Sequence, residues 1–117
     1  MVNPGPILRT PFSWGICAIV APALATLAHE AGHYVAYWGF DASNIVFHYA
    51  SVDADDTALS AGQIALAGIA GPLVGWFFAL SSFLIGRRKP TPFVSALGVG
   101  ANLRAVVGLG YLVVALL

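Results

Sequence analysis

Three long runs of apolar residues divide this chain, at about residues 12–40, 59–85 and 93–117. Each run supplies the roughly 20 residues with which an α-helix crosses the hydrocarbon core of a bilayer. Polar residues gather mainly between the runs, as expected for spans joined by short connections. The chain is therefore predicted to be an all-α integral membrane protein with three transmembrane helices, built as a single membrane-embedded domain over residues 1–117.

The first two runs are separated by the polar and acidic residues 41–57, a segment without Lys or Arg. Within it, Asn44–Val52 is rich in β-branched and aromatic residues, so a short β-strand or hairpin is expected between the first and second spans. The edge of such a strand is suited to pair with an extended substrate segment. His48 is interpreted as a histidine of this strand rather than as a metal ligand.

The composition agrees with a membrane protein. Hydrophobic residues make up 59% of the chain and charged residues 9%, whereas roughly a quarter of the residues of a soluble domain are charged. The lipid bilayer is therefore the expected surrounding. The formal net charge of zero offers no electrostatic basis for binding nucleic acid, and the sequence leaves the oligomeric state open.

The first run begins with Thr10 and Pro11, which are typical of an N-cap followed by proline at the first helical position. The run is longer than one span requires, so the helix is expected to tilt, to protrude or to bend near Pro22. A cleaved signal peptide is the alternative, because Arg9 and the triplet Ala23–Ala25 resemble its charged and cleavage regions. The hydropathy continues past the triplet, which favours a retained span.

A cluster of ionisable residues interrupts the first run, in the motif His29-Glu30-Ala31-Gly32-His33. Residues four apart share one face of a helix, so the two imidazoles can bind one Zn²⁺ while Glu30 lies beside the water that the ion activates. Ionisable groups are costly in hydrocarbon and usually mark a site or an aqueous path; a cluster that only packs between helices is the alternative. The motif predicts peptide hydrolysis, with His29 and His33 as zinc ligands and Glu30 as the catalytic general base.

The second run contains a stripe of small residues, Ala67, Gly71 and Gly75, at four-residue spacing. Such a stripe lets a neighbouring helix approach closely, and the first span is the expected neighbour. Pro72 in mid-span removes a backbone N–H and leaves a carbonyl oxygen without its usual donor. Gly71 and Pro72 are therefore either part of a kinked packing helix or direct neighbours of the active site.

The third run is interrupted by Asn102 and Arg104. An arginine at this depth has to face a cavity, pair with a carboxylate or extend its charged end to the membrane surface, and an inward orientation is expected. The run reaches Leu117 without a polar flank, which leaves open that the chain is a fragment of a longer protein.

The basic residues predict an orientation in the membrane. Arg9 and the turn Arg87–Lys89 fall on one side of a three-span arrangement, and the acidic residues 41–57 fall on the other. The positive-inside rule then places the N-terminus in the cytoplasm and the histidines near the outer face. The expected location is the cytoplasmic membrane of a prokaryote.

On these residues the chain resembles the site-2 protease family of intramembrane zinc metalloproteases. The similarity covers roughly residues 12–85 and consists of the motif at residues 29–33, the strand-like segment after it, and Ala70-Gly71-Pro72, which is similar to the Gly-Pro element of that family. The resemblance implies zinc as cofactor, a three-helix catalytic core, and a membrane protein or peptide as substrate, cleaved in a membrane-spanning or juxtamembrane segment.

Two features depart from the family pattern. The family draws a third zinc ligand from an aspartate on its third core helix, where this chain has Asn102-Leu103-Arg104. Asn102 is similar to part of that region, but a neutral amide is a weak zinc ligand. The ligand then lies beyond Leu117 in a longer protein, or comes from an aspartate of residues 53–56, or is missing. The family also usually keeps its zinc towards the cytoplasm, opposite to the orientation expected here.

These residues are compatible with three functions. The leading hypothesis is a zinc-dependent intramembrane endopeptidase. The first alternative is a non-catalytic relative that binds membrane proteins through the small-residue face as a binding or regulatory module. The second is a small transporter or channel subunit that uses His29, Glu30, His33 and Arg104 as an ion path.

Overall fold

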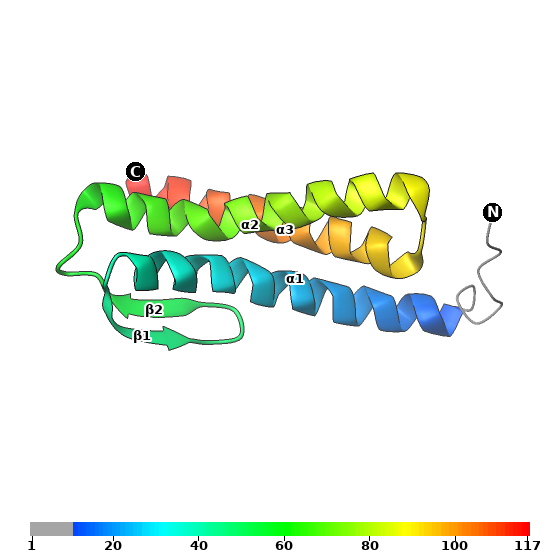
Figure 1. Ribbon diagram of the computed structural model, residues 1–117, viewed down its shortest axis with the longest axis horizontal. Helices are drawn as coiled ribbons and strands as arrows, with labels where there is room; N and C mark the ends of the chain where they lie inside the picture. Colours follow the sequence, from blue (N-terminus) through cyan, green and yellow to red (C-terminus); the bar gives the residue numbers. More distant parts are fainter. Residues whose placement is uncertain (1–10) are drawn as a thin grey trace.

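The structure, a computed structural model, describes residues 11–117 as three long helices and one hairpin. The elements follow the order α1 (Pro11–Gly39), β1 (Ser43–Phe47), β2 (Val52–Asp55), α2 (Ala61–Arg88) and α3 (Pro92–Leu116) (Figure 1). Each helix is long and apolar enough to cross a membrane, α3 over its Pro92–Tyr111 portion. The predicted fold class is confirmed, with the hairpin between the first two helices.

Local sequence signals explain where α2 and α3 begin. The Ser60 hydroxyl accepts the backbone N–H of Gln63, and the Gln63 side chain accepts the N–H of Ser60, which is a complete capping box. Thr91 caps α3 in the same way from its side chain, with Pro92 at the first helical position. The predicted cap at Thr10 and the charge of Arg9 lie outside the described residues.

The interior of the bundle is built from small side chains. Among the side chains that the structure describes, the buried hydrophobic ones are all alanines: Ala21, Ala25, Ala67, Ala101 and Ala105. Large apolar side chains point outward instead, and Phe12 and Ile19 are 78% and 75% exposed. A soluble protein rarely leaves so much apolar surface open, whereas in lipid the helices associate through close contact of small residues. The bundle is therefore suited to a bilayer.

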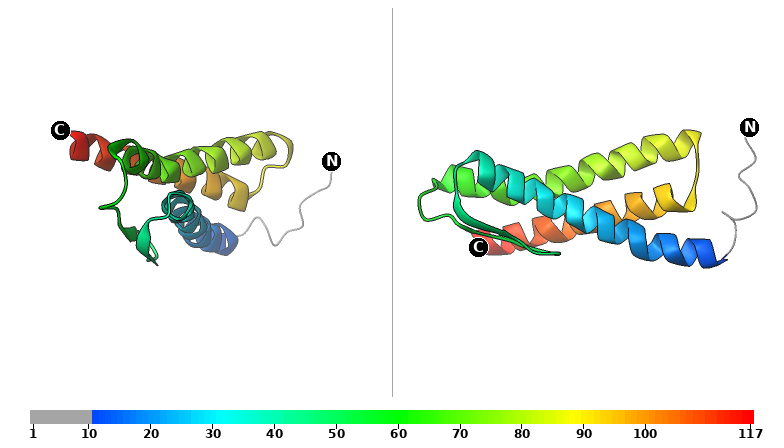
Figure 2. Two further views of the ribbon diagram at one scale, coloured as in Figure 1. Left: turned by 60° about the vertical axis from the view of Figure 1, so that its left-hand side comes forward. Right: turned by 60° about the horizontal axis from the view of Figure 1, so that its bottom comes forward.

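Glycines allow the helix backbones to approach. A Cβ atom added to Gly75 of α2 would lie 3.0 Å from the Cβ of Ala105, and one added to Gly100 of α3 would lie 2.9 Å from the Cα of Pro22. Pro22 thus lies at a contact with α3, and α1 continues through it as one helix. The three helices pack side by side, with α1 crossing the antiparallel α2–α3 pair (Figure 2).

The hairpin folds back along the C-terminal part of α1 (Figure 1). Its strands are antiparallel, with Phe47 opposite Val52, and the N–H of His48 donates to the carbonyl of Ser51 at 2.9 Å to close the turn. The rings of Phe47 and Tyr34 pack edge to face on α1. The hairpin predicted within residues 44–52 is therefore confirmed, and it extends to residue 55.

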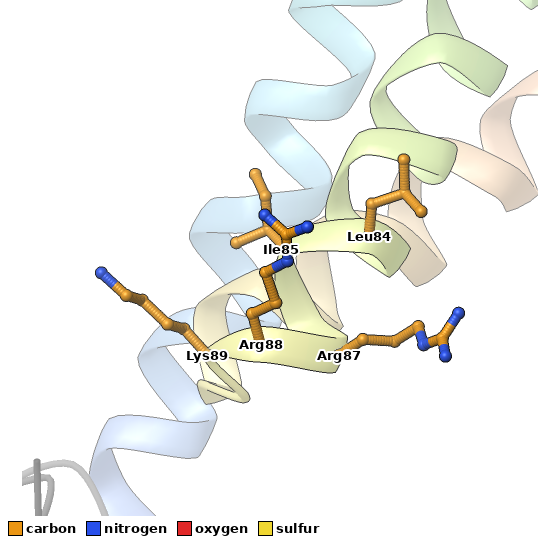
Figure 3. Close-up of a pocket in the computed structure, with 5 residues that line it drawn as sticks. All are labelled: Leu84, Ile85, Arg87, Arg88 and Lys89. Atoms are coloured by element: carbon orange, nitrogen blue, oxygen red, sulfur yellow. The ribbon is translucent and has the colours of Figure 1, made fainter. Parts of the chain in front are cut away.

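The two ends of the bundle differ in charge. The basic turn after α2 lies at the same end as the start of α1, and the acidic hairpin lies towards the other end (Figures 1 and 2). In Figure 3 the side chains of Arg87, Arg88 and Lys89 diverge from one another, and the Arg87 guanidinium lies over the ring of Phe83. This is the charge separation on which the predicted orientation depends.

Candidate metal centre

The motif of the first span lies on the inner face of α1. His29 is 1% exposed and Glu30 is 2% exposed, although both are ionisable. His29 continues the line of Ala21 and Ala25 at four-residue spacing, which is the repeat of one helix face, and Glu30 follows it in the chain. The small side chains of that face let α2 and α3 close around the two polar residues.

The two histidines turn their Nε2 atoms towards each other. These atoms lie 3.2 Å apart, and the ring planes cross at 73°. Two imidazole ligands of a tetrahedral zinc ion, each about 2.0–2.1 Å from the metal, have nitrogen atoms about 3.3 Å apart. The spacing of His29 and His33 therefore fits two ligands of one zinc ion.

Helix α2 sets the protonation of His33. The Nδ1 atom of His33 lies 2.7 Å from the carbonyl oxygen of Ala67, and a carbonyl oxygen only accepts, so Nδ1 carries the proton. In the neutral ring Nε2 then carries a lone pair, which can accept a hydrogen bond from the Nε2 atom of His29 or bind a metal. The Nδ1 atom of His29, in contrast, is buried and has no hydrogen-bond partner among the described residues.

Glycines make room for both imidazoles. A Cβ atom added to Gly71 of α2 would lie 2.3 Å from the Nε2 atom of His33. One added to Gly108 of α3 would lie 2.8 Å from the Cε1 atom of His29 and 3.2 Å from the Cγ atom of Pro72. Gly71 is therefore a direct neighbour of the histidines, as the sequence allowed, and Pro72 lies buried beside it.

Gly108 was missed by the sequence reasoning. The signal was present, because Ala101, Ala105 and Gly108 repeat at spacings of four and three residues and form a small-residue face like that of α2. In the structure Ala101 and Ala105 are fully buried. This face brings α3 against His29.

Arg104 pairs with Glu30. Its Nη2 atom contacts the Oε1 atom of Glu30 and donates a second hydrogen bond, at 3.0 Å, to the carbonyl oxygen of Ala50 in the hairpin turn. The Arg104 side chain is 22% exposed, and its Nε atom is buried without a partner among the described residues. The inward orientation expected for this arginine is confirmed, and its partner is the predicted general base.

Asn102 does not take the expected place near the site. It lies on the exposed side of α3, next to the buried Ala101, and α3 faces His29 with Gly108 instead. One residue turns the helix by about 100°, so a residue at a similar depth can still face away from the site. The prediction that Asn102 is an active-site neighbour is not supported.

The acidic loop does not fold back as a source of the third ligand. The Asp53 side chain is 73% exposed and accepts from the Nε2 atom of His48 at 3.0 Å, so His48 is an exposed residue of the hairpin turn. Asp55 accepts hydrogen bonds from Thr57. Over residues 11–117, no group of three His, Cys, Asp or Glu side chains is arranged to hold a metal ion. His29 and His33 therefore lie together without a third side chain of these types placed to share a metal ion with them in the described part of the chain.

Two hollows on the surface are lined by residues other than the two histidines. The larger one, about 710 Å³, is at the basic turn and is lined by the residues drawn in Figure 3. A second, about 600 Å³, is an apolar groove between α1 and α3. Thr26 and Arg104 line this groove, so it reaches the arginine that holds Glu30.

No protein-family model, no curated protein and no solved structure matches this chain.

Proposed function

We propose that this protein is a zinc-dependent intramembrane endopeptidase, or the catalytic core of one. It would hydrolyse peptide bonds of membrane proteins or peptides in membrane-spanning or juxtamembrane segments. The observation that carries the proposal is the pair of Nε2 atoms of His29 and His33, 3.2 Å apart inside an apolar bundle, with one ring oriented by the carbonyl of Ala67. For His33 this arrangement suits a metal ligand, because the ring nitrogen that faces away from His29 is held by a carbonyl oxygen and Nε2 keeps its lone pair.

Each ionisable residue of the motif has a role in this proposal. His29 and His33 would hold the ion, and a bound zinc ion would supply a Lewis acid for the scissile carbonyl and for water. Glu30 accepts a proton from the attacking water and passes it to the leaving amine. Since Arg104 contacts Oε1, this proton transfer falls to Oε2. The proposal further requires a ligand in addition to the two histidines.

The location belongs to the same proposal. The basic turn after α2 and the acidic hairpin lie towards opposite ends of the bundle, and basic loops stay on the cytoplasmic side. We infer a cytoplasmic membrane, of a prokaryote, with the basic turn inside and the hairpin towards the outer face.

Metal analysis tests the proposal most directly. Protein purified in detergent is expected to contain close to one zinc per chain, and His33→Ala is expected to lose it. His48→Ala is the matched control, because His48 is an exposed histidine paired with Asp53 on the hairpin. Absence of zinc from the wild-type protein, or equal zinc in the wild type and His33→Ala, would contradict the proposal.

A non-catalytic binding module is the second candidate. The pairing of Glu30 with Arg104 and the incomplete ligand set over residues 11–117 favour it. Glu30→Gln separates the two functions, because the amide keeps the shape of the side chain and cannot act as a base. Loss of peptide cleavage with zinc retained supports the protease, and partner binding that is unchanged in Glu30→Gln, without cleavage by the wild type, supports the binding module.

A further inference from the structure

Two residues of the candidate centre, His29 and Glu30, are shielded from solvent, whereas His33 is only partly buried. His29 and Glu30 are almost completely buried, and the groove between α1 and α3 reaches Arg104 rather than the histidines. Hydrolysis of a peptide needs water and an extended stretch of substrate beside these residues. Some part of the structure around the site therefore has to move.

The hairpin is the element with the fewest attachments to the bundle. Both strands lie against α1, but with far fewer close residue pairs than any two of the helices share, and the rings of Tyr34 and Phe47 form one of these contacts. The connection to α1 passes through Asp41, at a φ of 57°, a backbone conformation that Asp adopts more readily than most residues. Its strands pair only with each other. Moving the hairpin would therefore leave the contacts among the three helices in place.

Arg104 ties the turn of this hairpin to the buried site. The Nη2 atom of Arg104 donates both to the carboxylate of Glu30 on α1 and to the carbonyl of Ala50 in the turn. One nitrogen atom of Arg104 on α3 thus connects α1 with the hairpin turn. The contact with Ala50 is a single hydrogen bond near the surface, whereas the contact with Glu30 is an ion pair in the interior.

We propose that Arg104 is a latch that holds the hairpin turn over the His29–Glu30–His33 site, and that the site opens when the bond from Arg104 to the Ala50 carbonyl breaks. Opening leaves the pair between Arg104 and Glu30 intact, so no buried charge is left without a partner during the movement. The purpose of the latch rests on the proposed function, because admission of water and peptide is what hydrolysis requires. The latch itself is a property of the fold that a measurement without substrate can detect.

A nitroxide label on the turn measures the latch. Tyr49, which is 59% exposed and precedes Ala50, is replaced by cysteine in a Cys17→Ala background, so that the label attaches at one position. The electron paramagnetic resonance spectrum is then compared among the parent, Arg104→Lys and Arg104→Gln in lipid nanodiscs. Arg104→Lys keeps a cation beside Glu30 but ends one bond short of Nη2, so it is the variant that protects the fold. Arg88→Lys, at the opposite end of the bundle, is the matched control.

Both Arg104 variants are expected to raise the ratio of mobile to immobile label by roughly tenfold, the factor that corresponds to the loss of one hydrogen bond to a charged group. Arg88→Lys is expected to leave the spectrum unchanged. A label that is equally immobile in the parent and in Arg104→Lys overturns the latch, and so does one that is already fully mobile in the parent. These outcomes are independent of catalysis: a mobile label in the variants of a protein without zinc or cleavage would support the latch and contradict the proposed function.

Discussion

The arginines at the basic turn and the arginine in the middle of α3 occupy opposite environments. Arg87 and Arg88 end α2, where their side chains spread outward (Figure 3) and the negative end of the helix dipole favours positive charge. Arg104 lies within the apolar length of α3 and is held by a carboxylate from α1. A cation at the membrane surface needs no protein partner, because water and lipid headgroups solvate it. A cation among the spans does, and its partner here belongs to the candidate site.

The comparison teaches how to interpret charge in an apolar chain. The same residue type marks the edge of the membrane in one place and a polar interior in the other. The interior pair costs desolvation energy that a pair of apolar residues would avoid. Its presence beside two histidines is therefore better explained by a role in the site than by a contribution to stability.

The largest expected effect comes from breaking the interior pair on one side only. Arg104→Ala leaves Glu30 buried without a counter-charge, and such a loss typically destabilises a protein by about 3–5 kcal/mol. Arg88→Ala at the surface is expected to change stability by less than about 0.5 kcal/mol. Thermal unfolding in the same detergent measures both variants. The double variant Glu30→Gln with Arg104→Gln removes both charges and is expected to recover much of the lost stability. Equal effects of Arg104→Ala and Arg88→Ala on stability would contradict the distinction between the two environments.

The second effect tests the space beside the histidines. Gly71→Ala places a Cβ atom 2.3 Å from the present position of the His33 Nε2 atom, so the imidazole has to leave its place, at a cost of about 1–3 kcal/mol for overpacking. Zinc binding is expected to fall in parallel. Gly15→Ala is the control, because nothing lies within 4 Å of a Cβ atom at Gly15, and alanine there is expected to be neutral or slightly stabilising. Zinc content that is the same in both variants would show that His33 does not bind the metal in this position.

The sequence predicts the helices, the hairpin and the orientation of Arg104, but not which residue pairs with Arg104. The spans follow from hydropathy and length, since the membrane requires both. The hairpin follows from β-branched and aromatic residues between them. The inward orientation of Arg104 follows from the cost of charge in hydrocarbon. Its partner did not follow, because Glu30 is 74 residues away and several aspartates were equally available in the sequence.

The face of α3 was the harder property to predict. Its residues are apolar almost all round, so no amphipathic stripe indicates which side packs against the neighbouring helices. Asn102, as the polar residue in the region, attracted the prediction and lies exposed. Gly108 carries no functional group and contacts the site because it is small. In a membrane bundle the small residues report helix contacts more reliably than the polar ones.

The smallest expected effect concerns Asp55, whose carboxylate is exposed and not ion-paired, in contrast to the buried carboxylate of Glu30. The hydroxyl and the backbone N–H of Thr57 donate to the Oδ1 atom of Asp55, at 2.6 and 3.2 Å, and these bonds hold the pKa of Asp55 below its usual value. Because the pKa is lowered in the folded loop, the bonds stabilise the loop above the ordinary pKa of an aspartate, and this contribution is lost as the pH falls through the lowered value. Thr57→Val is expected to remove the hydrogen bond from the hydroxyl and to raise the pKa of Asp55 towards its ordinary value. A carboxyl-detected NMR titration measures this pKa. Zinc content and thermal stability at neutral pH are expected to stay nearly unchanged. If the substitution left the pKa of Asp55 unchanged, the Thr57 hydroxyl would not be the cause of the lowered pKa. If the substitution reduced the zinc content, the loop would be coupled to the buried site. The contrast between exposed and interior charges would then fail at this end of the molecule.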